Sequence, residues 1–278
     1  MKWITIPNFD LESTRYIKQQ YHIAIQIVVL PGRSYLQESP RDEHATLELD
    51  DHRNSLVGKW ISCKNNRWRC GISMEQKKIY FEEEGSPVPL EVGFRNKTFN
   101  ELMLWLEESL AIAGFAVASL NSSTPYKLPD YTKQKTPLCF DCNNGLEIFF
   151  AFYKNSSFLF ENFKKYVGVH CENRLWPRHL NQKISIMIKD SGEPSTSTYL
   201  GLGMSPGDEY YDEPYLYVNC WPYLEGDLPK PSVGFWHTDD WVGTVFLFSD
   251  LAKLSNQMDM ANQFLIDSYH TIKEGLLN

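Results

Sequence analysis

The chain has 278 residues, of which 42% are hydrophobic and 14% aromatic, and its formal net charge is −8. This composition provides a sizeable core and excludes a disordered chain. The negative charge and the lack of a dense Lys/Arg run disfavour nucleic acids and anionic membranes as partners. No apolar run approaches the roughly 18 residues that span a bilayer, and no export signal is visible. We therefore expect a cytoplasmic protein whose six cysteines are reduced.

The first elements predicted along the chain are a helix and an antiparallel meander. Asp10 is placed to cap a helix that begins at Leu11, and Pro31 with Gly32 is expected to end it. Short alternating runs then predict strands over residues 46–49, 56–62, 68–73 and 78–82. The short polar turns between these runs favour antiparallel pairing.

A second helix is predicted from a local signal at each of its ends. Thr98 and Glu101 form a capping box, and Gly114 ends the helix. Residues 121–144 are rich in Asn, Ser, Pro, Lys and Asp, which is typical of a connection. The next predicted helix covers residues 146–166.

The last part of the chain returns to strands. Alternating runs predict them over residues 183–189, 198–202, 215–221 and 243–248, and a final helix is expected over about residues 256–276. Clusters of strands broken by isolated helices indicate an α+β fold rather than a regularly alternating parallel sheet. We predict one α+β domain over residues 1–278, with antiparallel sheet, flanking helices and a possible subdivision near residues 121–144.

Acidic and aromatic residues are concentrated together in residues 204–241. This segment contains eight acids and a single base, Lys230, so it holds nearly the whole negative excess of the chain. It also contains nine aromatic residues. The predicted strand 215–221 within it has two unlike faces.

Alternation places Leu216, Val218 and Cys220 on one face of that strand, which is a plain core face. The opposite face carries rings with hydrogen-bonding tips and one amide: Tyr215, Tyr217, Asn219 and Trp221. Such a face suits the wall of a ligand cavity, but it also suits a second buried face whose hydroxyls are satisfied internally. Both interpretations stay open at this point.

The sequence Ser205-Pro206-Gly207-Asp208 predicts a tight turn before this strand, because proline presets the second position and glycine accepts a positive φ at the third. The turn holds Asp208, Glu209, Asp212 and Glu213 on one short loop. Carboxylates in close pairs repel by about 1 kcal/mol even in water. We expect this loop to be splayed into solvent, or to hold a cation or a basic partner.

Two histidines are candidate metal ligands. His179 follows Trp176-Pro177-Arg178, and His237 precedes Asp239 and Asp240. A pair of histidines with one or two carboxylates is the ordinary composition of a zinc, iron or manganese site. No HExxH or similar closely spaced motif accompanies them, and a single histidine is more often structural.

Three segments have distinctive sequences: WPRHLN at residues 176–181, SPGDEYYDEPYLYVNCWPY at 205–223, and the pair Trp236-His237. Together with PGRSYL at 31–36, DEH at 42–44 and LVG at 56–58, this set resembles a bacterial family defined as a domain of unknown function. The resemblance covers most of the chain and implies one continuous unit, without an activity. Arg178 and Asn181 stand where the family pattern has histidine and aspartate, so a metal set at these positions would lack two ligands.

The sequence predicts a small-ligand cleft with polar and aromatic walls in the second half of the chain, suited to a sugar or a cationic metabolite. Its candidate residues are Asp208, Glu213, Tyr215, Tyr217, Asn219, Trp221, His237 and His179. One alternative is a metal-dependent enzyme that uses His179, His237 and nearby carboxylates, with a divalent metal as cofactor. Another is an acidic module that docks a basic protein. Neither a reaction nor an oligomeric state follows from the sequence.

Overall fold

The structure, a computed structural model, describes residues 2–39, 41–73, 76–124, 126–130, 136–139, 145–193 and 195–277. These residues form an α+β fold with two antiparallel sheets, as the sequence predicted. The chain divides into two compact units. Unit 1 comprises Met1–Arg15, Asn144–Arg174 and Asn181–Asn278, and unit 2 comprises Tyr16–Asn143 and Leu175–Leu180. None of the described helices is long and apolar enough to cross a membrane.

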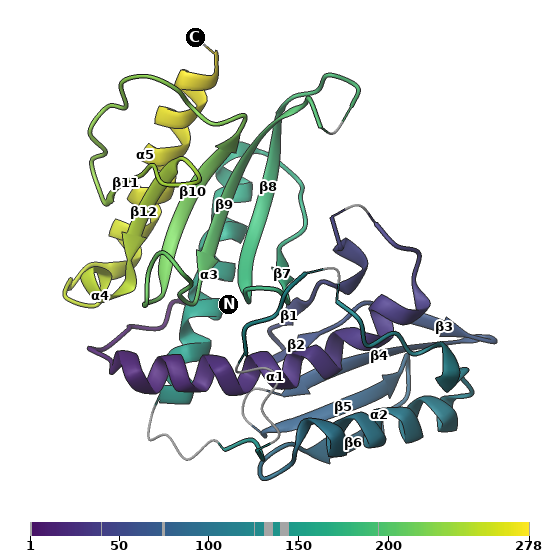
Figure 1. Cartoon of the computed structure of the whole chain (residues 1–278). Coiled ribbons are helices and arrows are strands. Elements are labelled where there is room, and N and C mark those ends of the chain that lie inside the picture. Colours follow the sequence, from purple (N-terminus) through teal and green to yellow (C-terminus); the bar gives the residue numbers. More distant parts are fainter. Residues whose placement is uncertain are drawn as a thin grey trace. The chain divides into compact units, whose positions relative to one another are not determined.

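Unit 1 is built on a six-stranded antiparallel sheet, sheet A, whose strand order is β11-β12-β10-β9-β8-β7 (Figure 1). Its strands are β7 (Arg174–Trp176), β8 (Asn181–Lys189), β9 (Thr198–Ser205), β10 (Tyr215–Trp221), β11 (Phe235–His237) and β12 (Gly243–Leu247). The helices of this unit are α3 (Gly145–Val167), the short α4 (Phe248–Leu251) and α5 (Gln257–Leu277).

Helices α3 and α5 cover one face of sheet A (Figure 1). Gln182 of β8 donates a hydrogen bond to Ser157 of α3 at 2.5 Å, and Thr244 of β12 donates one to Ser268 of α5 at 2.8 Å. The same face buries alternate apolar residues of the central strands: Ile184, Leu200, Leu202, Leu216 and Val218. Burial of this face stabilises the unit, at about 25 cal/mol per Å² of apolar surface.

Two side-chain amides hold the N-terminal segment in unit 1. Asn155 of α3 accepts from the N–H of Ile4 and donates to its carbonyl, at 2.8 and 2.7 Å. Gln257 at the start of α5 does the same for Ile6, at 2.8 Å in both directions. Each amide therefore replaces the backbone partner that a neighbouring strand would have supplied.

Unit 2 is built on sheet B, in which the strand order is β1-β2-β4-β5-β6 and β3 pairs with β4. Its strands are β1 (Glu48–Asp50), β2 (Ser55–Val57), β3 (Ile61–Cys63), β4 (Asn66–Ser73), β5 (Lys78–Glu83) and β6 (Leu90–Gly93). Its helices are α1 (Leu11–Tyr35), whose first residues belong to unit 1, and α2 (Phe99–Ala113), with the 3₁₀ turns η1 (Glu43–Ala45) and η2 (Val117–Ser119).

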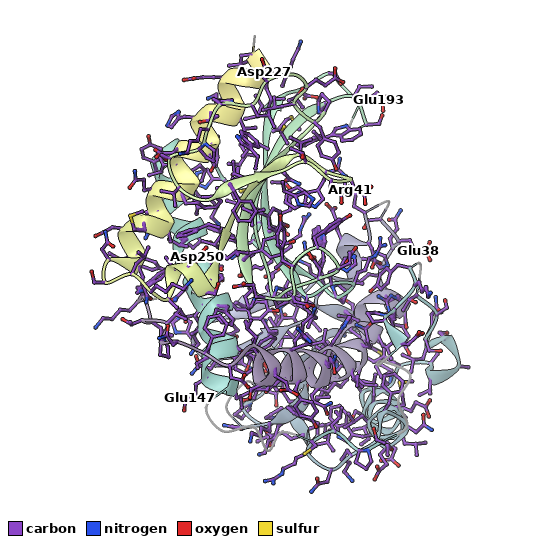
Figure 2. The ribbon with its side chains drawn as sticks, turned by 60° about the vertical axis from the view of Figure 1, so that its left-hand side comes forward. Glu38, Arg41, Glu147, Glu193, Asp227 and Asp250 are labelled. Atoms are coloured by element: carbon purple, nitrogen blue, oxygen red, sulfur yellow. The ribbon has the colours of Figure 1, made fainter. Side chains whose placement is uncertain are left out.

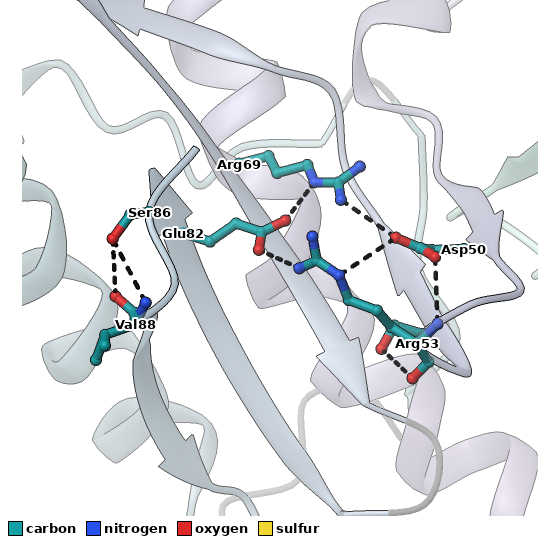
Figure 3. A network of polar contacts seen from close by, with 7 residues as sticks. Asp50, Arg53, Arg69, Glu82, Ser86 and Val88 are labelled. Carbon is teal, nitrogen blue, oxygen red and sulfur yellow. Dashed lines mark hydrogen bonds and ion pairs between the residues drawn. The ribbon is translucent and has the colours of Figure 1, made fainter. Parts of the chain in front are cut away.

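Sheet B also has two unlike faces. One buries the apolar side chains of Cys70, Ile72, Ile79 and Phe81. The other carries a charge network, in which Arg69 and Arg53 each donate to one oxygen of Glu82 (Figure 3). Both guanidinium groups also approach Asp50, at 3.3 and 3.7 Å. Two positive and two negative groups therefore balance each other, with Glu82 only 4% exposed.

Helix α1 extends beyond its predicted end. Pro31 lies inside the helix, which continues to Tyr35, and the N–H of Leu36 still donates to the carbonyl of Gly32 at 3.1 Å. A Cβ at position 32 would lie 2.5 Å from the carbonyl oxygen of His44, so glycine lets the following segment pack closely against the helix. Tertiary packing here outweighs the hydrogen bond that proline removes.

The second helix agrees closely with its prediction. The capping box of Thr98 and Glu101 is present, and Gly114 ends α2 with a φ of 89°. The run predicted as one strand over residues 56–62 is instead two strands, β2 and β3, which both pair with β4: Val57 is opposite Gly71 and Ile61 opposite Trp68, so the register shifts by one residue between them. The connection predicted at 121–144 lies partly outside the described residues.

Candidate functional site

Strand β10 has the two faces that its alternation predicted. Leu216, Val218 and Cys220 lie on the face that α3 and α5 cover, and each is at most 3% exposed. The opposite face of sheet A is here called the polar-aromatic face. It carries Tyr215, Tyr217, Asn219 and Trp221 of β10 together with the residues that pair with them on β9, β8 and β12.

Exposure on the polar-aromatic face increases along β10. Tyr215 and Tyr217 are 3% and 7% exposed, Asn219 is half-buried, and Trp221 is 52% exposed. The first two tyrosines therefore belong to a buried face, whereas the end of the strand presents an open ring. Both interpretations of this face apply, each to a different part of it.

The buried end is a cluster of aromatic rings with internal hydrogen bonds. Tyr215, Tyr217 and Val245 pack with Tyr211 and Trp241. The hydroxyl of Tyr215 donates to Asp208 Oδ2 at 2.5 Å, and the amide of Asn181 donates to the hydroxyl of Tyr217 at 3.2 Å. Burial raises the pKa of Tyr217 to about 12, so this phenol is neutral at physiological pH.

Asp208 organises the turn that precedes β10. Gly207 has the positive φ, 99°, that the turn prediction requires. One oxygen of Asp208 accepts from the backbone N–H groups of Tyr210 and Tyr211, at 3.0 and 3.3 Å. The other accepts from Ser205 at 3.2 Å as well as from Tyr215. Both carboxylate oxygens are thus engaged within the protein.

The neighbouring acids have separate partners. Glu213 accepts from the backbone N–H of Ser249, in the first turn of α4, at 3.1 Å. Asp212 forms an ion pair with Arg15 at 3.2 Å, although both side chains are well exposed. The structure therefore places Glu213 against α4 and does not bring it into the group around Asp208.

His237 belongs to the same aromatic cluster. Its Nε2 lies 2.5 Å from the carbonyl oxygen of Asp239, which can only accept, so Nε2 carries a proton. Its Nδ1 then accepts from the hydroxyl of Tyr211 at 2.8 Å, and its ring stacks on Trp241 with centroids 4.1 Å apart. Both ring nitrogens are used in positioning the loop.

His179 lies in unit 2, beside His22, whose pKa it helps to lower. The other seven predicted site residues lie in unit 1. Among the residues that the structure describes, no group of three or more His, Cys, Asp or Glu side chains could hold a metal ion. The metal-centre hypothesis therefore gains no support from the described side chains.

Glycines form the floor in the middle of the polar-aromatic face. A Cβ at Gly203 would lie 2.1 Å from the ring of Tyr217, and one at Gly201 would lie 2.2 Å from Lys183 Cε. Lys183 and Tyr217 can therefore lie flat on β9. The ammonium group of Lys183 is 3.4 Å from the Asn219 Oδ1 atom, which is half-buried with it.

The exposed end of the face is a row that crosses three strands. Met187 of β8 pairs with Tyr199 of β9, and Tyr199 pairs with Trp221 of β10. Met187 is 51% exposed. The ring of Tyr223 meets that of Trp221 edge to face, with centroids 5.5 Å apart. We call these four residues the aromatic row.

Two loops border the aromatic row. The β8–β9 loop carries Glu193, and the β10–β11 loop carries Asp227, both near the end of unit 1 at which α5 finishes (Figure 2). Asp250 of α4 marks the other end. The indole N–H of Trp221 points to the carbonyl of Ser195 in the first loop at 3.4 Å, which fixes the side chain beside it.

The sequence did not identify Lys183, Met187 and Tyr199 as members of this surface. Each lies on a correctly predicted strand, so alternation predicted which residues of that strand share a face with it. What the sequence lacked was the register between β8, β9 and β10, because pairing partners are far apart in the chain.

A separate open pocket of about 700 Å³ lies at the C-terminal end of α3, and none of the predicted site residues line it. Its lining residues are Glu161, Lys164, Lys165, Gly168, Val169, His170, Cys171 and Glu172. Lys164 is paired with Glu161 at 2.6 Å and donates to the carbonyl of Cys171 at 3.1 Å. Burial raises the pKa of the Cys171 thiol, which makes it a poor nucleophile.

No protein-family model, no curated protein and no solved structure matches this chain. The resemblance carried by the WPRHLN and SPGD…EPY segments therefore stays a prediction.

Proposed function

We propose that this protein binds a small polar ligand with an apolar ring face, of the kind that a sugar provides, on the exposed end of the polar-aromatic face. The observation that carries the proposal is the aromatic row. Trp221 is 52% and Met187 51% exposed, on either side of Tyr199 in the register, on a face that no described helix of unit 1 covers.

Stacking supplies the main contact. An indole face binds the C–H face of a sugar ring by burial and dispersion, and a held ring loses little entropy on binding. Tyr223 and the Ser195 carbonyl restrain Trp221 on two sides, so the side chain is positioned before a ligand arrives. The row thus combines exposure with order.

Hydrogen-bonding groups adjoin the stacking surface. On the same face, Asn219 is the next side chain along β10 from Trp221, and Lys183 is the second side chain along β8 from Met187. Ser185, which lies between Lys183 and Met187 on that face, is exposed. An amide, an ammonium group and a hydroxyl together match the hydroxyls of a sugar. The ammonium of Lys183 also favours a neutral or anionic ligand over a cationic metabolite.

The proposal is for binding without an assigned reaction. Acid–base catalysis by paired carboxylates needs oxygens that can reach a substrate. Asp208 uses both oxygens within its turn, and Glu213 bonds to the backbone of α4. Tyr215, Tyr217 and His237 lie at the buried end of the same face, where they pack with one another's neighbours rather than contact the ligand.

Titration of the full chain with a panel of monosaccharides, followed by saturation-transfer NMR and calorimetry, tests this function. We expect Trp221→Ala to weaken binding by roughly 1–2 kcal/mol, about 5- to 30-fold in Kd. Tyr166→Ala is the matched control, because this ring is equally exposed but lies on α3.

Choline serves as the cationic member of the panel. Binding of choline in place of every sugar would contradict the ligand class. Equal binding by Trp221→Ala and the wild type would contradict the site.

A further inference from the structure

A buried arginine in unit 2 has donors without acceptors. Arg33, near the end of α1, has a side chain that is only 4% exposed. Its Nη2 donates to the hydroxyl of Tyr126 at 2.8 Å. Its Nε and Nη1 atoms are buried and have no hydrogen-bond partner among the described residues. A buried charged donor without an acceptor is costly, and such groups usually mark a site where something else binds.

The carboxylate nearest to Arg33 does not satisfy it. Asp42 Oδ2 is 3.7 Å from Arg33 Nη2, beyond hydrogen-bond length, and is itself buried without a hydrogen-bond partner. Its other oxygen is 3.6 Å from His44 Nε2. Asp42 also has a left-handed φ of 56°, which is unusual for a residue other than glycine. The pair is therefore loose, although both members are held in place.

A second arginine, Arg178, which is distant in the sequence, also lies near the ring of Tyr126. The guanidinium carbon of Arg178 lies 5.8 Å from the centre of the Tyr126 ring, and that of Arg33 lies 5.6 Å from it. Both guanidinium groups thus lie within 6 Å of the centre of one ring, with Asp42 as the carboxylate next to Arg33. Arg178 is exposed, whereas Arg33 is buried.

The backbone that carries Arg178 is fixed from α1. His22 and Gln26, one turn apart on this helix, both bond to the carbonyl of Pro177, at 2.8 and 3.0 Å. The Oε1 atom of Gln26 is buried without a partner as well. The side of α1 that carries Gln26 and Arg33 therefore presents unsatisfied polar atoms at two positions about two turns apart.

We propose that unit 2 binds an oxyanion, the phosphate or carboxylate group of a small molecule, between Arg33 and Arg178 and beside Tyr126. The planar fork of a guanidinium group matches the oxygens of either group, and an ion pair formed away from water is strong. The bound oxyanion accepts from the unpaired donors of Arg33 and from Arg178. This site is separate from the sugar surface proposed above and does not depend on it.

The charge at position 178 supports an anion over a metal cation. Position 178, in the segment 176–181, is an exposed arginine. An arginine cannot ligate a metal and repels one, but it attracts phosphate and carboxylate. The segments PGRSYL, DEH and WPRHLN supply Arg33, Asp42 and Arg178, so three of the motifs noted in the sequence contribute to one location.

Calorimetry and thermal denaturation of the full chain with inorganic phosphate and with acetate test the proposal, against chloride at equal ionic strength. We expect saturable binding of at least one oxyanion. Arg178→Gln should weaken it about tenfold or more, because a charged hydrogen-bonding partner is lost. Arg178 is exposed, so this variant should keep the circular dichroism spectrum of the wild type.

Arg67→Gln is the matched control, because Arg67 is a half-exposed arginine of the same unit that pairs with Glu84. It should leave the Kd within about twofold. Binding of phosphate alone identifies a phosphorylated ligand, and binding of acetate identifies a carboxylate. Absence of a saturable effect beyond chloride overturns the proposal, and so does an equal loss in Arg178→Gln and Arg67→Gln, which shows non-specific attraction.

Discussion

Sheets A and B both pack a tyrosine ring over a glycine of the neighbouring strand, but they differ in the polar groups on the face that carries this ring. In each, a strand glycine lies beneath a tyrosine of the neighbouring strand. Gly71 pairs with Tyr80 in sheet B, and Gly203 pairs with Tyr217 in sheet A. A Cβ at either glycine would lie 2.4 Å or less from the tyrosine ring. Each ring can therefore lie flat on the sheet and fill the space that a side chain would take.

The two polar faces differ in how their polar groups are satisfied. On sheet B, Arg53, Arg69, Asp50 and Glu82 neutralise one another, as Figure 3 shows. On sheet A, hydrogen bonds use the tyrosine hydroxyls at the buried end and leave ring faces exposed at the other. A closed charge network fixes a surface, whereas an aromatic face with an open end can also bind.

The largest expected effect is at the charge network. Glu82→Gln leaves two guanidinium groups with Asp50 as the one remaining carboxylate of the network, in a largely buried place. We expect a loss of about 3 kcal/mol in the free energy of unfolding, measured by urea denaturation. Glu84→Gln, which breaks the exposed pair with Arg67, should cost about 1 kcal/mol or less. Similar losses in both variants would show that the network is no more than a set of surface pairs.

The second effect is a pH dependence of the free energy of unfolding, caused by His22 of unit 2. Burial lowers the pKa of His22 from 6.5 to about 4, so the folded chain keeps this ring neutral. Below pH 6.5 the unfolded chain binds a proton that the folded chain does not. Stability should therefore fall as the pH drops from 6.5 to 4, by roughly 3 kcal/mol in total.

Urea denaturation of the wild type and of His22→Gln at several pH values measures this slope. The variant keeps a neutral donor for Pro177 and should lose most of the dependence above pH 5. His270→Gln, on the exposed side of α5, is the control and should keep the slope. A slope that persists in His22→Gln would assign it to other groups.

The third effect tests the shared glycine device. We expect Gly203→Ala and Gly71→Ala each to destabilise the protein by about 2 kcal/mol, because a buried ring must move. Gly93→Ala is the matched control, since a Cβ there meets nothing within 4 Å. Chemical denaturation compares the three. If the first two variants are as stable as the third, the tyrosines are not held flat.

The smallest effect concerns the ring cluster at the buried end of the polar-aromatic face. Tyr211→Phe removes the hydroxyl that donates to His237 Nδ1 and leaves a buried acceptor, at a cost of about 1 kcal/mol. Tyr210→Phe removes a hydroxyl that bonds to the exposed Asp240 and should change stability little. Denaturation curves and the ¹⁵N shifts of His237 separate the two. An unchanged His237 spectrum in Tyr211→Phe would contradict the assigned bond.

Local signals in the sequence predicted the local structure well. The capping box at Thr98 and the glycine at position 114 bounded α2, and the alternation of β10 separated its two faces. The helix end predicted at Pro31 was wrong because proline is a local helix-breaking signal. The packing of the DEH segment against Gly32, which accompanies the longer helix, is a contact that the local sequence does not show. The ends of helices and strands were thus predictable where residues close in sequence determine them.

The candidate site was predictable only in part, because its members meet through register. Tyr215, Tyr217 and Trp221 were assigned to one face, but their different exposure depends on what lies above each ring. Lys183 joins Asn219 only through the pairing of β8 with β9 and of β9 with β10. Arg33 and Arg178, which both lie near Tyr126, are separated by about half of the chain, and no periodicity in the sequence relates them.

The chain passes between unit 1 and unit 2 four times, and both of its described ends lie in unit 1. A pulling force applied at Lys2 and Leu277 is therefore transmitted first through unit 1, where the amides of Asn155 and Gln257 clamp the N-terminal segment. Unit 2 bears no load until that clamp opens. In a single-molecule stretching experiment, this threading predicts an ordered rupture, in which the N-terminal segment detaches from unit 1 before unit 2 bears force.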